Sequence, residues 1–184
     1  MSDINYEERI FDHMELQKNL MEVLGVFKLP DPEKMEVALL NIAGESIEAL
    51  GFVLDKTKPW KESVFDADKV KEEVIDVYHF YLQLLVVADL YENVSEIDGW
   101  PVITYATNKI VSLKRALKES ASEAAELSNW HTKRELEFFS TEQWLRFLTI
   151  FFCLDMTPED VDALYRAKNA RNFERIKEKM DERK

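Results

Sequence analysis

Two short stretches of the sequence each place two carboxylates three residues apart. They are "GESIEAL", which contains Glu45 and Glu48, and "VKEEVID", which contains Glu73 and Asp76. On a helix, residues three or four apart lie on the same face, so each pair would present its two charges side by side. The neighbouring residues are mostly Leu, Ile and Val, which indicates that both stretches belong to helices packed against a core.

Four carboxylates in such apolar surroundings need compensation, because an unpaired buried charge costs on the order of several kcal/mol. No Lys or Arg lies on either stripe, which makes bound cations the economical partners. Ligands that are all carboxylates favour hard ions, Mg²⁺ or Mn²⁺. The alternative is an acidic stripe that faces solvent or a basic protein partner.

A di-iron site is a second metal alternative. Helical di-iron carboxylate proteins use two Glu-x-x-His motifs. Asp76 and His79 form half of one such motif, whereas His13 and His131 have no acid three residues before them. The missing second motif disfavours iron.

The stretch "YRAKNARNFER" near the C-terminus gathers cationic and amide side chains on one predicted helix face. Lys168, Asn172 and Arg175 fall at i, i+4 and i+7, with Asn169 and Arg171 beside them. Guanidinium, ammonium and amide groups suit phosphate oxygens. The alternative is a solvated basic helix end that complements the helix dipole. Beside a polycarboxylate metal site, this face predicts a nucleoside triphosphate bridged by Mg²⁺.

The loop "KTKPWKE" offers two further candidates. Trp60 has the ring to stack on a base, and Lys58 has the reach and charge to contact a phosphate. The alternative for Trp60 is that it closes the hydrophobic core.

The elements that must position these side chains are helices. Only four Gly and five Pro in 184 residues leave few turns, and the length fits one domain over residues 1–184. The all-α fold should be a bundle of about six helices, with the metal site between the two that carry the acidic pairs. Periodicity and capping signals predict helices at about 6–24 (ended by Gly25), 31–54 (begun by Asp31), 68–91, 103–138 (broken at a Ser120–Glu123 capping box), a short one begun by Ser140 and Gln143, and a last one opened by Thr157, Pro158 and Asp160.

The composition excludes several classes of protein. A net charge of −12 disfavours nucleic-acid binding, although 8 Lys and Arg face 4 Asp and Glu from Arg166 to Lys184. The longest apolar run, Phe147–Leu154, is too short for a membrane span. The acidic N-terminus is not a signal peptide, and the single cysteine, Cys153, excludes a disulfide framework. A soluble, cytoplasmic protein is expected.

These motifs resemble the all-α NTP pyrophosphatases and, within that superfamily, the dimeric dUTPases. The family pattern E-x-x-E, E-x-x-D and a late K-N-x-x-N-x-x-R corresponds here to "ESIE", "EVID" and "KNARNFER". "KPW" and "DVYHF" fit two further family features, and Gln17 in "LQKNLM" resembles a base-contacting glutamine. The match covers roughly residues 14–90 and 145–176, whereas residues 92–140 do not align.

The resemblance implies an enzyme that hydrolyses dUTP to dUMP and pyrophosphate with two or three Mg²⁺ ions (or Mn²⁺), and that forms a homodimer. Glu48 would also orient the attacking water as a base. The implied site residues are Glu45, Glu48, Glu73 and Asp76 for the metal; Lys58, Lys168, Asn172 and Arg175 for the phosphates; and Gln17, Trp60, His79, Phe80 and Asn169 for the base and sugar.

The chain also departs from the family pattern. Ile176 follows Arg175 where the family usually has Arg-Gln, the tail lacks a Gly-Tyr, and Met21 occupies a position that is usually polar. Base choice therefore stays open, with dCTP or a broad MazG-like dNTP range as alternatives to dUTP. Two non-enzyme alternatives are a helical interaction protein and a relative that binds nucleotide without turnover.

Overall fold

A computed structural model describes residues 6–54, 65–90, 108–129 and 131–182, and all regular structure in these ranges is helical. This finding confirms the predicted all-α fold of about six helices, because the described ranges contain six α-helices. The elements are α1 (Tyr6–Leu24), the short 3-10 helix η1 (Val26–Lys28), α2 (Asp31–Leu54), α3 (Ala67–Ala88), α5 (Lys109–Leu127), α6 (Lys133–Cys153) and α7 (Pro158–Asp181).

Local signals in the sequence set most of the helix ends. Gly25 adopts a left-handed conformation (φ 74°) directly after α1, which ends the helix at the predicted place. The side chain of Asp66 accepts a hydrogen bond from the backbone N–H of Lys69 and caps α3. Thr157 and Asp160 form the reciprocal capping box that starts α7.

The predicted break at Ser120 is wrong, because α5 runs through it without interruption. Ser120 is buried, and its hydroxyl lies 2.9 Å from that of Ser46 across the α2–α5 contact. Glu123 accepts a hydrogen bond of 2.7 Å from Arg146 of α6. Both side chains therefore connect neighbouring helices and do not cap one.

The predicted start of a helix at Ser140 and Gln143 is also wrong. The hydroxyl of Ser140 donates to the carbonyl of Glu137 in the middle of α6. The helix begins earlier, at a capping box formed by Thr132 and Glu135. The sequence contains several Ser/Thr-x-x-Glu/Gln patterns, and only burial decides which of them lies at a helix end.

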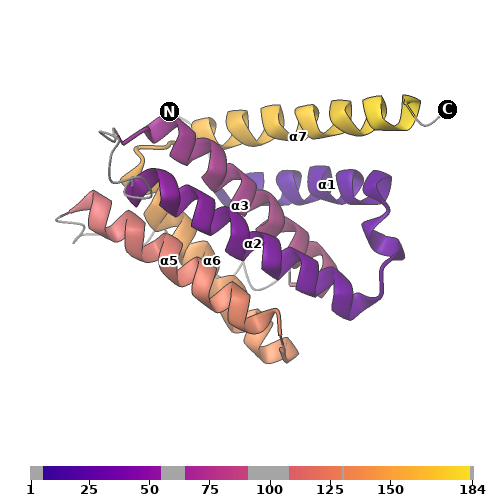
Figure 1. Ribbon diagram of the computed structural model, residues 1–184, viewed down its shortest axis with the longest axis horizontal. Coiled ribbons are helices and arrows are strands. Elements are labelled where there is room, and N and C mark those ends of the chain that lie inside the picture. Colours follow the sequence, from indigo (N-terminus) through magenta and orange to yellow (C-terminus); the bar gives the residue numbers. More distant parts are fainter. Residues whose placement is uncertain (1–5, 55–64, 91–107, 130, 183–184) are drawn as a thin grey trace.

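The helices form a layered bundle, with α2 and α3 between the α1–α7 pair and the α5–α6 pair (Figure 1). A cluster of aromatic side chains joins α3 to α6, where the Phe147 ring lies 5.4 Å from that of Tyr78 and 5.2 Å from that of Tyr81. Tyr165 of α7 lies 5.7 Å from Tyr78 and connects α7 to the same core. This packing fixes α3 relative to α6 and α7, and α3 also packs along α2, so the helices that carry the acidic pairs and the late basic motif are held together.

Candidate active site

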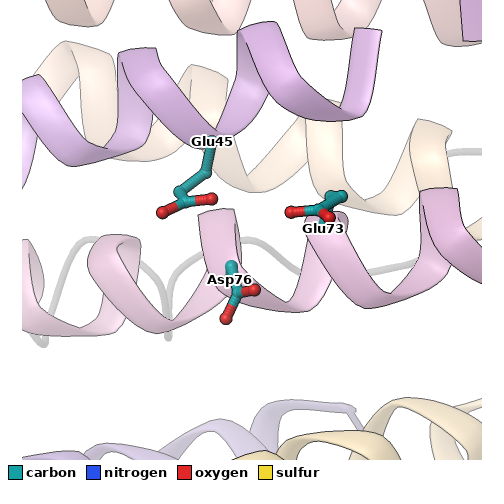
Figure 2. Close-up of side chains that lie close together, drawn as sticks. All are labelled: Glu45, Glu73 and Asp76. Carbon is teal, nitrogen blue, oxygen red and sulfur yellow. The ribbon is translucent and has the colours of Figure 1, made fainter. Parts of the chain in front are cut away.

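Three of the four predicted metal ligands meet between α2 and α3. Glu45, Glu73 and Asp76 each offer a carboxylate oxygen, and these oxygens lie within 4.8 Å of one another. Figure 2 shows Glu45 pointing from α2 toward α3, which carries the other two. Glu73 and Asp76 share a face of α3 because they are three residues apart.

The environment of this cluster disfavours negative charge. Burial, followed by the nearby charge of Asp76, raises the pKa of Glu45 to about 7. Burial also raises the pKa values of Glu73 and of Asp76. Carboxyl groups with raised pKa values beside one another gain stability when a cation joins them. The cluster is thus suited to a divalent ion bound through oxygen.

A lysine of α7 already provides one positive charge. Lys168 Nζ lies 2.6 Å from Asp76 Oδ2, and both side chains are about four-fifths buried. A basic side chain from another helix therefore compensates part of the negative charge of the acidic stripes. Lys168 is 92 positions from Asp76 in the chain and approaches from a third helix, so the contact does not appear in the spacing on either stripe.

The titration of Glu45 gives a testable pH dependence. Its carboxyl keeps its proton to a pKa of about 7 in the folded protein, against an ordinary value of 4.5 in the unfolded chain. The unfolded state loses the proton first, so the free energy of unfolding falls as the pH rises between these two values. Glu45→Gln should therefore raise the Tm of the metal-free protein, by a margin that grows from about pH 5 to about pH 7 and then levels.

Thermal melts in a chelator across this pH range check the prediction. Glu72→Gln is the matched control, because Glu72 is an exposed carboxylate of α3 outside the cluster. A margin that is the same at every pH, or as large for Glu72→Gln, would contradict the assigned environment of Glu45.

The fourth predicted ligand, Glu48, lies beside the cluster and not within it. Its side chain is exposed, one turn after Glu45 on α2. It is close enough for its charge to raise the pKa values of Glu45 and Glu73, after the larger effect of burial. Its role as ligand or base stays a prediction.

The predicted phosphate-binding face of α7 lies over the acidic cluster. Lys168 contacts Asp76 directly, and burial raises the pKa of Asp76 while the charges of Lys168, Arg171 and Arg175 oppose that shift. Asn172, on the same face of α7, is half-buried. An acidic wall on α2 and α3 therefore stands opposite a cationic wall on α7.

A buried group of polar side chains adjoins this arrangement. His79, one turn beyond Asp76 on α3, lies 2.7 Å through Nδ1 from Gln17 Oε1 of α1. Tyr165, for which the sequence carries no functional signal, donates a hydrogen bond of 3.2 Å to the same oxygen. Two polar atoms are buried without a hydrogen-bond partner, His79 Nε2 and Asn169 Nδ2. Of the five predicted nucleoside-binding residues, Gln17 and His79 thus contact each other, and Asn169 of α7 is close enough to Tyr165 to affect its pKa.

The other predicted site residues are less enclosed or lie outside the described ranges. Phe80 is half-buried beside His79 on α3. Lys58 and Trp60 fall outside the described residues. No histidine of the described residues belongs to the carboxylate cluster, so the arrangement gives no support to the di-iron alternative.

The comparison with protein families decides the identity. The dUTPase family matches the chain over residues 11–180. The protein belongs to the dUTPase family. The match includes residues 92–140, which the motif comparison left unaligned.

Membership in the dUTPase family fits the assembled geometry. It identifies the protein as a hydrolase of nucleoside triphosphates, and the carboxylates of Glu45, Glu73 and Asp76 are close enough together to hold a metal ion. No curated protein and no solved structure matches this dUTPase-family chain. None of the described helices is long and apolar enough to cross a membrane.

Proposed function

We propose that the protein is a Mg²⁺-dependent pyrophosphohydrolase that converts dUTP to dUMP and pyrophosphate in the cytoplasm. The observation that carries the proposal is the oxygen-lined cluster of Glu45, Glu73 and Asp76 opposite the cationic face of α7.

The donor atoms of the cluster fit a hard divalent cation. All are carboxylate oxygens, the ligands that Mg²⁺ and Mn²⁺ prefer. Glu45, Glu73 and Asp76 would hold the metal, joined by Glu48, and by resemblance each site would take two or three ions. When bound, the metal would polarise the α-phosphate and lower the pKa of a coordinated water.

The chain's own residues would position the triphosphate and move one proton. Lys168, Asn172 and Arg175, with Lys58, would bind the phosphate oxygens as charge-assisted donors. Glu48 would accept a proton from the water whose oxygen attacks the α-phosphorus. The bond between the α-phosphorus and the bridging oxygen then breaks, and pyrophosphate leaves toward the cationic side chains.

The nucleoside would lie beside the acidic cluster. Gln17, His79 and Asn169 offer polar atoms that are mostly buried, and Phe80 and Trp60 would enclose a single ring. A pocket built for one ring favours pyrimidines over purines. The preferred substrate would be dUTP.

Competition assays that give kcat/KM for dUTP, dCTP, dTTP and dATP test the substrate. The proposal expects dUTP to be preferred, with dCTP as the second substrate and dATP as a poor one. Preference for dATP, or near-equal use of all four, would assign the protein to the broader MazG-like class.

A homodimer is part of the proposal, and one face of α2 supports it. Val37, Leu40 and Ile47 are 39–60% exposed, which is high for large apolar side chains. Gly44 and Gly51 lie on the same face of α2. The five residues are spaced alternately three and four positions apart, which is typical of a helix face that packs against a second helix. A Cβ at either glycine would meet no atom within 4 Å. Since a mid-helix glycine costs about 1 kcal/mol against alanine, close approach of a second copy's backbone gives both glycines a reason.

Leu40→Glu should convert the dimer to a monomer, because it buries a charge in the seam. Val23→Glu is the matched control, since Val23 on α1 is as exposed as Leu40 (both 49%). Sedimentation velocity measures the outcome. A parent protein that is monomeric, or a dimer that Leu40→Glu leaves intact, would contradict this interface.

A further inference from the structure

The buried polar side chains between α1, α3 and α7 form a hydrogen-bond network in which each donor and acceptor can be assigned. The Tyr165 hydroxyl lies 2.9 Å from the backbone carbonyl of His13 and 3.2 Å from Gln17 Oε1. Both neighbours are oxygens that only accept, so the hydroxyl donates to both in a shared hydrogen bond. The side-chain oxygen of Gln17 is thereby held toward Tyr165 and His79.

This orientation of Gln17 determines the tautomer of His79. His79 Nδ1 lies 2.7 Å from Gln17 Oε1. An amide oxygen cannot donate, so Nδ1 must carry the imidazole proton. Burial lowers the pKa of His79 to about 3, so the ring is neutral and its second nitrogen, Nε2, is left as an acceptor.

The free acceptor faces no donor in the described parts of the chain. His79 Nε2 is buried and has no hydrogen-bond partner, and the whole residue is 4% exposed. A buried acceptor without a hydrogen-bond donor destabilises the protein, so a ligand whose N–H donates to His79 Nε2 should bind more tightly. Uracil carries an N–H at ring position 3, whereas cytosine has a lone pair there.

We propose that Tyr165 is a positioning residue that sets base specificity: through Gln17, its hydroxyl holds His79 in the tautomer that accepts from the ring N–H of uracil. This inference rests on the proposed function and adds a residue to it. Gln17 alone does not decide between the two bases, because a free amide can rotate to present either its oxygen or its nitrogen. The Tyr165 hydroxyl donates to the Gln17 oxygen, and this hydrogen bond favours the orientation in which the same oxygen faces His79. With cytosine, the ring nitrogen and His79 Nε2 would both present lone pairs.

The substitution Tyr165→Phe tests the role, since it deletes only the hydroxyl. The preference for dUTP over dCTP, measured as the ratio of kcat/KM values, should fall about tenfold, because Gln17 can then turn and His79 can change tautomer. Nitrogen–proton correlation spectra should show His79 protonated at Nδ1 in the parent and a mixture of both tautomers in the variant. Gln17→Met releases His79 in the same way and should give the same mixed spectrum even if Tyr165→Phe folds poorly.

Tyr81→Phe is the matched control. Tyr81 is also a fully buried tyrosine, and its hydroxyl donates to the backbone carbonyl of Ser140, away from this group. The control should change neither the ratio nor the spectrum. The tautomer spectra need no substrate. If the protein hydrolyses no dNTP, the ratio of its affinities for dUMP and dCMP replaces the ratio of kcat/KM values. Failure of the proposed function can therefore be distinguished from failure of this inference. A parent His79 protonated at Nε2, or a Tyr165→Phe variant with unchanged spectrum and ratio, would overturn the inference.

Discussion

Asp76→Asn should lower the turnover of dUTP on the order of a thousandfold and leave the helical circular dichroism unchanged. The substitution removes the charge of a carboxylate that lies within 4.8 Å of Glu45 and Glu73 oxygens. The amide oxygen that remains can still accept the hydrogen bond from Lys168, so the contact between α3 and α7 should persist. The loss would therefore report metal binding and not unfolding.

The same variant should no longer respond to metal. In the parent protein, Mg²⁺ at about 100 times its dissociation constant should add about 2.7 kcal/mol to the free energy of unfolding, because it binds only the folded state. Thermal melts with Mg²⁺ and with chelator measure this gain. Glu72→Gln, an exposed neighbour outside the cluster, should keep both turnover and the response. If Asp76→Asn retains a near-parental rate, Asp76 is not a ligand.

Arg175→Ala should weaken triphosphate binding by about 1.5–3 kcal/mol, the range for a hydrogen bond to a charged group. That loss corresponds to an affinity about 10- to 150-fold lower. Arg175 is exposed, yet its charge acts on Asp76 together with those of Lys168 and Arg171. The proposal is that this exposed guanidinium would bind a phosphate held beside the acidic cluster.

Titration calorimetry with a dUTP analogue that has a nonhydrolysable α–β bridge measures the effect. Lys177→Ala is the control, because this substitution also removes one positive charge, from an exposed residue on the opposite face of α7. If both variants bind equally well, or Arg175→Ala binds as the parent does, α7 is only a solvated basic helix at this position.

The sequence predicts those parts of the fold that depend on neighbouring residues. Gly25 and the Thr157–Asp160 box mark helix ends through contacts that span one turn. Glu73 and Asp76 share a face because of their spacing alone. Such features require no knowledge of how distant helices pack.

Features that depend on packing between distant helices could not be predicted. The ion pair of Lys168 with Asp76 joins two helices that spacing cannot place together. Ser120 has the sequence context of a cap, but the contact with Ser46 places it inside α5. Tyr165 looks like an ordinary core residue in the sequence, and only its position between α1 and α3 gives its hydroxyl a role.

The exposed face of α2 illustrates the same limit. An apolar stretch predicts a buried helix, yet Leu40 and Ile47 are exposed in the single chain. Composition cannot distinguish a residue buried in its own core from one buried against a second copy. The dimer test above addresses that difference.

The most direct test of the proposed function is product analysis after dUTP is incubated with the purified protein, with and without Mg²⁺. The carboxylate cluster and the cationic face of α7 predict dUMP and pyrophosphate in equal amounts with Mg²⁺, and no hydrolysis in chelator. Phosphorus NMR distinguishes these products from dUDP and orthophosphate. Release of dUDP and orthophosphate, or equal hydrolysis with and without metal, would contradict the proposed function.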